Sequence, residues 1–159
     1  MSLLKFCKIY FWITGIILLS GSFLFLLTYL SNLTISTAVG EFKKSAYPLG
    51  FISLVFIVLL VLIPALLDLL SAYYIDKQKE IGRVLGRVAA FLGILPGQST
   101  FLMVITTTAV LTFIEKLLGF VPGLFAAIFS IGTWVIFWIG FMVVFVVLDP
   151  DIAKKYFER

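Results

Sequence analysis

The chain has 159 residues, of which 62% are hydrophobic and 13% are charged, and its mean hydropathy is +1.20. Soluble domains are about 45–50% apolar and about 25% charged, so this composition excludes an ordinary soluble domain and indicates a protein that works in lipid. The net charge of +4 is not gathered into a basic patch with interleaved aromatic residues, so no nucleic-acid partner is expected. With no histidine and one cysteine, Cys7, no haem, zinc, iron–sulfur or copper cofactor is expected from this chain alone.

The first apolar segment covers residues 9–30 and contains no charged residue. A helix rises 1.5 Å per residue, so about 20 residues cross a hydrocarbon core of roughly 30 Å. The segment is longer than the apolar region of a signal peptide, and we therefore predict a retained membrane-spanning helix. Residues 31–47, which are rich in Ser and Thr, form the polar connection that follows it.

The second apolar segment covers residues 48–75 and contains Pro64 and Asp68. Proline lacks a backbone N–H and cannot complete the helical hydrogen-bond ladder, so a kink is expected near residues 60–64. Asp68 follows this proline by about one turn. A carboxylate inside an apolar run is costly, which makes Asp68 the most informative single residue of the chain.

The third apolar region allows two interpretations, because Pro96 and Gly97 interrupt it. In the first, one kinked helix of about 88–114 spans the membrane. In the second, residues 77–94 form an interfacial helix and a short span follows from Gly97 to Ile114. We favour the kinked helix.

The fourth apolar segment covers residues 120–148 and is rich in Phe and Trp. A short helix of about 150–157 is predicted after it, with Asp149 as its N-cap and Pro150 at its first position. Its Lys-rich and aromatic composition is typical of a helix on the membrane surface. The whole chain, 1–159, is thus predicted to be one integral membrane domain: an all-α bundle of four transmembrane helices with a C-terminal interfacial helix.

The distribution of lysine and arginine predicts the orientation of this multi-pass protein. Three regions hold nine of these residues: the N-terminal tail, the 76–87 connection and the C-terminal tail. The two alternate connections hold three, at Lys43, Lys44 and Lys116. Because positive residues are retained on the cytoplasmic side, both termini and the 76–87 connection are predicted to be cytoplasmic.

The intramembrane carboxylate of Asp68 is expected to have a partner. Arg83 and Arg87 lie on the same predicted side of the membrane, so an ion pair with one of them would fix the packing of the second and third spans. The alternatives are a role in proton or cation movement and contact with a partner subunit. A lone acid without a second intramembrane acid or histidine is a poor proton relay.

Two further patterns supply candidate residues. Gln98, Thr100 and Thr107 make the third span the most polar one, and they are predicted to form one polar helix face. Small residues recur every fourth position, which permits close helix packing. These residues are Gly82, Gly86 and Ala90 in one stripe, and Gly119, Gly123 and Ala127 in the other.

No nucleotide-binding loop, nucleophile elbow or metalloprotease motif is present in the sequence, and serine or threonine would lack a histidine base. The protein is therefore not expected to be an enzyme. We expect a structural or accessory subunit that packs against other proteins of a membrane complex. The alternative is a homo-oligomeric channel or small transporter that uses Asp68 and the polar face of the third span. The expected partners are the lipid bilayer and other membrane subunits or further copies of the chain.

Overall fold

The computed structural model describes residues 3–38, 55 and 58–157, and within them every regular element is helical. Four segments are long and apolar enough to cross a membrane: Leu3–Leu27, Leu59–Asp76, Gly97–Leu118 and Gly123–Val147. The predicted all-α fold with four such helices is confirmed. The elements are α1 (Leu3–Ala38), the π-helical turn η1 (Val58–Leu62), α3 (Ile63–Asp76), α4 (Glu80–Ile94), α5 (Pro96–Leu118), α6 (Gly123–Val147) and α7 (Pro150–Phe157).

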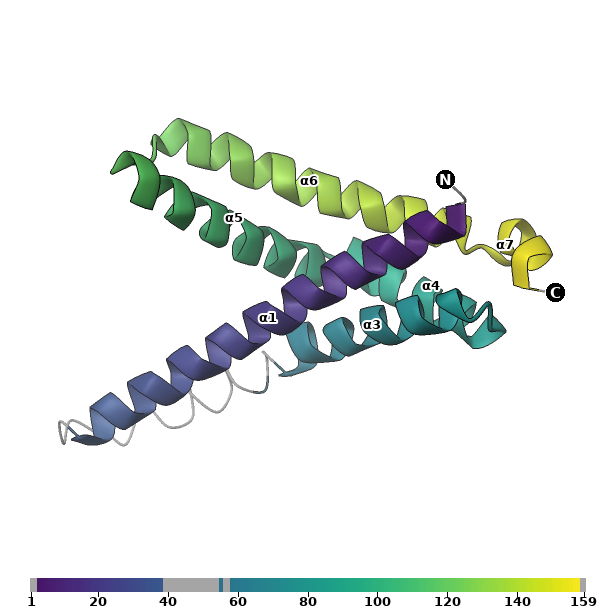
Figure 1. Cartoon of the computed structure of the whole chain (residues 1–159), viewed down its shortest axis with the longest axis horizontal. Coiled ribbons are helices and arrows are strands. Elements are labelled where there is room, and N and C mark those ends of the chain that lie inside the picture. Colours follow the sequence, from purple (N-terminus) through teal and green to yellow (C-terminus); the bar gives the residue numbers. More distant parts are fainter. Residues whose placement is uncertain (1–2, 39–54, 56–57, 158–159) are drawn as a thin grey trace.

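Helices α1, α3, α4 and α6 come together at one end of the molecule, whereas α5 begins further along, at the end of α4, and the helices diverge from the shared end (Figure 1). The start of α1, the end of α6 and α7 lie at this convergent end, together with the turn between α3 and α4. Lys8 pairs with Asp76 there, and Arg87 Nη2 lies 2.8 Å from Asp149 Oδ2. These ion pairs join α1 to α3 and α4 to the end of α6. The other end of α1 and the α5–α6 turn lie far apart.

The core lies toward the convergent end and follows one stripe of α1. Cys7, Phe11, Thr14 and Leu18 are fully buried, and their spacing of three or four residues places them on one helix face. This face packs against α3 and, near its start, against α6. The buried residues contributed by α6 are Phe137, Gly140, Phe141, Val144 and Val147.

The third apolar region consists of two helices, so the single kinked helix of 88–114 is wrong. Leu95 between α4 and α5 has extended backbone angles (φ −63°, ψ 146°), which interrupt the helix completely. The cause is local, because Pro96 disfavours the helical conformation of the residue before it. The boundaries are close to the second interpretation, 77–94 and then Gly97 onward. However, α4 differs from the predicted interfacial helix, because it packs along α3 and α6 and buries a complete face against them.

Several other predicted boundaries also shift. Helix α1 continues through the first part of the predicted polar connection to Ala38, whereas residues 39–54, 56 and 57 lie outside the described part of the chain. The irregularity expected before Pro64 takes the form of the π-helical turn η1. Helix α7 has its predicted bounds, and Asp149 Oδ1 accepts a hydrogen bond of 3.1 Å from the backbone N–H of Asp151, which confirms the N-cap.

Candidate functional site

The candidate site is the buried carboxyl group of Asp68, where α1, α3 and α5 meet. Asp68 has no solvent-exposed surface. Its Oδ2 accepts a hydrogen bond of 2.6 Å from Thr14 Oγ1 of α1 and one of 2.9 Å from Gln98 Nε2 of α5. Three helices that are distant in the sequence are thereby joined at one oxygen atom.

The break at Leu95 places Gln98 at this site. Because α5 begins at Pro96, Gln98 belongs to its first turn, so the hydrogen bond from Gln98 brings the carboxyl group of Asp68 next to the N-terminal end of α5. A helix N-terminus carries a partial positive charge and favours a neighbouring negative group. Trp138 of α6 supports the other side of the break, since its Nε1 donates a hydrogen bond of 3.1 Å to the Ile94 carbonyl oxygen at the end of α4.

The site contains polar atoms that have no hydrogen-bond partner among the described residues. Asp68 Oδ1, Gln98 Oε1 and Ser99 Oγ are buried and unpartnered. The same is true of the hydroxyl groups of Thr106 and Thr107, about two turns further along α5. A buried acceptor without a donor is costly, so these oxygens could accept hydrogen bonds from a bound water or bind a hydrated cation.

The predicted ion pair between Asp68 and an arginine of α4 is absent from the structure. Arg83 Nη2 lies 2.7 Å from Glu80 Oε1, and Arg87 pairs with Asp149. The reason is the orientation of α4: Gly82 and Gly86 face α3 and the core. Each arginine is one position further along the chain, about 100° around the helix, and therefore points away from α3.

The predicted polar face of the third span is also corrected. Gln98 and Thr107 are buried, whereas Thr100 is exposed. At about 100° per residue, the nine positions between Gln98 and Thr107 correspond to half a turn around the helix. The three residues therefore do not share a face, and only Gln98 reaches Asp68.

The first small-residue stripe lies in close helix contacts within the bundle. A Cβ atom on Gly82 would lie 2.6 Å from backbone atoms of Tyr74 and Ile75, and one on Gly86 would lie 2.6 Å from Leu148 Cδ1. Ala90 is fully buried. Small side chains thus allow α4 to pack tightly against its neighbours.

The second small-residue stripe is not a packing face among the residues that the structure describes. Gly119 ends α5 in the left-handed conformation, with φ 76° and its N–H bonded to the Glu115 carbonyl oxygen at 2.8 Å. It is a helix cap, for which glycine is favoured. A Cβ on Gly123 would meet no atom within 4 Å, and Ala127 is exposed.

Sequence reasoning missed the contribution of α1 to the site. Thr14 was a polar residue inside the first apolar segment, and its position on the Cys7–Leu18 stripe is the signal that could have identified it. Tyr10, one turn before Thr14, donates a hydrogen bond of 2.6 Å to the Phe137 carbonyl oxygen. Both contacts join α1 to the rest of the bundle.

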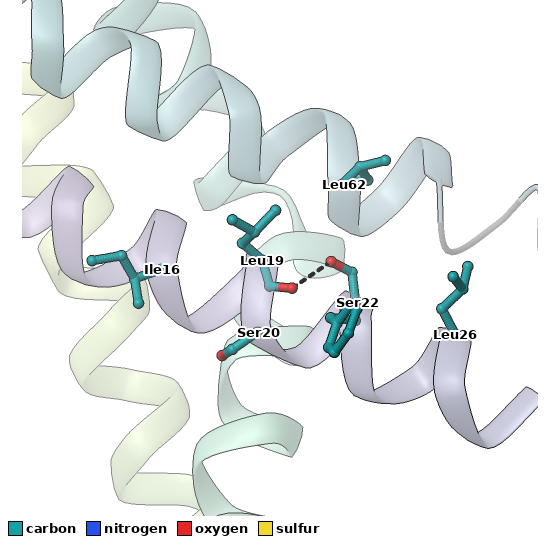
Figure 2. A pocket seen from close by; sticks show the side chains of 7 residues that line it. Ile16, Leu19, Ser20, Ser22, Leu26 and Leu62 are labelled. Atoms are coloured by element: carbon teal, nitrogen blue, oxygen red, sulfur yellow. Dashed lines mark hydrogen bonds between the residues drawn. The ribbon is translucent and has the colours of Figure 1, made fainter.

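A separate apolar groove of about 530 Å³ lies along α1 beside Leu62 (Figure 2). Its two serines do not offer free hydroxyl groups. Ser20 Oγ donates to the Ile17 carbonyl oxygen at 2.9 Å, and Ser22 Oγ donates to that of Leu19 at 2.8 Å, the contact dashed in Figure 2. This groove therefore presents a mainly apolar surface, in which the hydroxyl protons of both serines are already used.

The fold and the buried site define a class: an all-helical protein with four apolar helices of membrane-spanning length and a carboxyl group at a junction of three of them. Comparison with known protein families, with curated proteins and with solved structures finds no match for this chain.

Proposed function

We propose that this protein is an integral membrane accessory subunit that packs against another membrane protein through the far part of the α5–α6 hairpin. This part, residues 108–136, is called the hairpin arm below. No residue between Thr107 and Phe137 is buried, and this observation carries the proposal. The core-forming residues of α5 and α6 all lie nearer the convergent end.

The surface of the hairpin arm is suited to contact with transmembrane helices. Leu124 is 76% exposed and Leu117 is 67% exposed, and Phe125 and Phe129 stack with ring centroids 5.9 Å apart. Gly123 and Gly132 have open space where a Cβ would lie. In lipid, helices associate by close packing over small residues rather than by hydrophobic burial. The arm offers a partner both large apolar side chains and glycine positions at which another helix can approach closely.

The partner that fits best is a helical bundle of a different membrane protein. The far end of the hairpin arm, at the α5–α6 turn, diverges from α1 (Figure 1). A partner helix therefore has access to both α5 and α6 there. Native mass spectrometry of the full chain, gently extracted from its own membrane, should show a stoichiometric complex with a defined second protein. Recovery as a monomer or as a homo-oligomer alone would overturn the proposal.

Two matched substitutions test the surface itself. Gly132→Phe places a large side chain where the arm is open, and it should reduce the yield of the complex by about tenfold if a helix packs there. Val143→Phe enlarges a 40% exposed position of the same helix outside the arm and should leave the yield unchanged. Equal effects of the two substitutions would contradict this role of the arm.

The unpartnered oxygens at Asp68 favour a second candidate function, cation or proton movement by a small transporter. Its test is ion flux in proteoliposomes: Asp68→Asn should abolish flux, and Glu115→Gln, which changes an exposed acid in the last turn of α5, should not. Unchanged flux in Asp68→Asn would remove this candidate.

We further propose that both termini and the region 76–87, which comprises the α3–α4 turn and the first part of α4, face the cytoplasm. The excess of lysine and arginine in these regions supports this orientation. Their common position at the convergent end (Figure 1) is what a single cytoplasmic side requires.

A further inference from the structure

A second groove, of about 470 Å³, opens between α4, α6 and the start of α7 at the convergent end. Two of its lining residues are Arg83 and Arg87. The others are apolar: Val84, Val88, Phe91, Phe145 and Pro150. The groove thus combines two positive charges with a hydrocarbon surface.

The two guanidinium groups keep most of their hydrogen-bonding capacity. The side chain of Arg83 is only 16% exposed, yet its carboxylate partner Glu80 is 73% exposed. Surface ion pairs of this kind contribute little, so an anion in the groove can replace Glu80. Arg87 makes one hydrogen bond, to Asp149, and its guanidinium lies 4.8 Å from the Phe145 ring centroid. A guanidinium has five donors, and each arginine uses one of them within the described part of the chain.

The apolar lining continues along α4 away from the convergent end. Val84, Val88 and Phe91 recur at helical spacing and are 52%, 47% and 53% exposed. The opposite face of α4 is buried against the bundle, whereas this valine and phenylalanine surface stays about half exposed, with the Phe91 ring beside that of Phe145 at a centroid distance of 6.4 Å. Positive groups at the end of a span and apolar groups deeper in it match the order of a headgroup and its acyl chain.

We infer that this groove binds an anionic phospholipid, with the phosphate at Arg83 and Arg87 and one acyl chain along Val88 and Phe91. The inference rests on the proposed membrane location. Basic pockets between transmembrane helices recognise such headgroups, and arginine is suited to phosphate because its planar fork donates two parallel hydrogen bonds. The Asp149 carboxylate is already occupied by Arg87 and the Asp151 N–H, so it holds Arg87 in place. A free phosphate would leave the apolar part of the groove unused.

The test uses the purified full chain in nanodiscs of phosphatidylcholine, to which phosphatidylglycerol is added, with lipid binding followed by native mass spectrometry. We expect a preference for phosphatidylglycerol that the double variant Arg83→Gln/Arg87→Gln reduces by about 25-fold, since each arginine contributes about a factor of five. The control Lys77→Gln/Lys79→Gln removes the same charge from exposed positions of the adjacent turn and should change the preference by less than about twofold.

Three results would overturn the inference: equal binding of the two lipids, equal effects of the two double variants, or displacement of the lipid by millimolar inorganic phosphate. The single variant Arg83→Gln leaves the Arg87–Asp149 contact intact and should lose about fivefold, which separates headgroup binding from a disturbed fold. Flotation of the chain with liposomes is measured first. Failure to float would contradict the membrane location itself, whereas flotation without lipid preference would contradict only this inference.

Discussion

Asp68 shows how a single polar residue can organise an apolar bundle. Its Oδ2 holds Thr14 of α1 and Gln98 of α5, so the cost of burying the carboxyl group is partly offset by two hydrogen bonds. The second oxygen, Oδ1, has no partner among the described residues. Asp68 therefore combines a structural contact with an acceptor that remains available.

The hydroxyl group of Thr14 provides the first prediction. Thr14→Val keeps the shape of the side chain but removes the donor to Asp68, and we expect a loss of about 1 kcal/mol in unfolding free energy. Thr133→Val is the matched control, because the Thr133 hydroxyl donates to the Phe129 carbonyl oxygen of its own helix. Denaturation in mixed micelles measures the unfolding free energy of both variants. A loss in Thr133→Val as large as that in Thr14→Val would contradict the role of the interhelical contact.

At the scale of elements, α4 is the helix that packs against both α3 and α6. Its small residues face α3 and α6, and a Cβ on Gly93 would lie 2.3 Å from the Phe141 ring. Its larger residues face outward beside the arginine groove. The break at Leu95 then lets α5 leave the bundle at a different angle, which both positions Gln98 and creates the hairpin arm.

The second prediction concerns the contact of α4 with α3. Gly82→Ala forces a methyl group against backbone atoms of Tyr74 and Ile75, which cannot move independently, and overpacking of this kind costs about 1–3 kcal/mol. Gly132→Ala adds the same methyl group in open space and should be neutral or stabilising by up to about 1 kcal/mol, because alanine favours the helix. Thermal unfolding in detergent distinguishes them. Similar melting temperatures for both variants would show that α3 and α4 do not approach so closely.

At the scale of the whole molecule, ion pairs join the helices at the convergent end, whereas the helices separate toward the other end. The Lys8–Asp76 and Arg87–Asp149 pairs lie at the convergent end, where polar groups are expected beside a membrane surface. The hairpin arm and the far end of α1 diverge from it. This shape leaves the arm accessible to a partner and places the α5–α6 turn opposite the termini.

The third prediction follows from this shape and from the charge distribution. In a Cys7→Ser background, a cysteine at Lys79 should react with a membrane-impermeant maleimide only from the cytoplasmic side. A cysteine at Glu115, which ends α5 at the opposite side, should react only from the outside. Labelling of right-side-out and inverted vesicles measures this. Reaction of both positions from the same side would contradict a membrane-crossing α5.

The sequence by itself predicted the features that depend on neighbouring residues. Uncharged runs of sufficient length predicted four apolar helices, because length and hydropathy are properties of one segment. Asp149 and Pro150 predicted the start of α7, because a cap uses only the first helical turn. Pro96 signalled an interruption, although its extent was underestimated, since one kinked helix was favoured over two separate ones.

Only the tertiary structure decided which residues meet. The partners of Asp68 come from α1 and α5, 54 and 30 positions away, and no local pattern encodes such a contact. One of the arginines was expected to pair with Asp68 because both lie on the same predicted side of the membrane, but the rotation of α4 points them away from α3, and they pair with Glu80 of the same helix and with Asp149. That rotation is determined by Gly82, Gly86 and Gly93, whose missing side chains allow close approach only on one face. Segment composition thus determines which helices form, whereas the steric fit between their faces determines which polar groups come together.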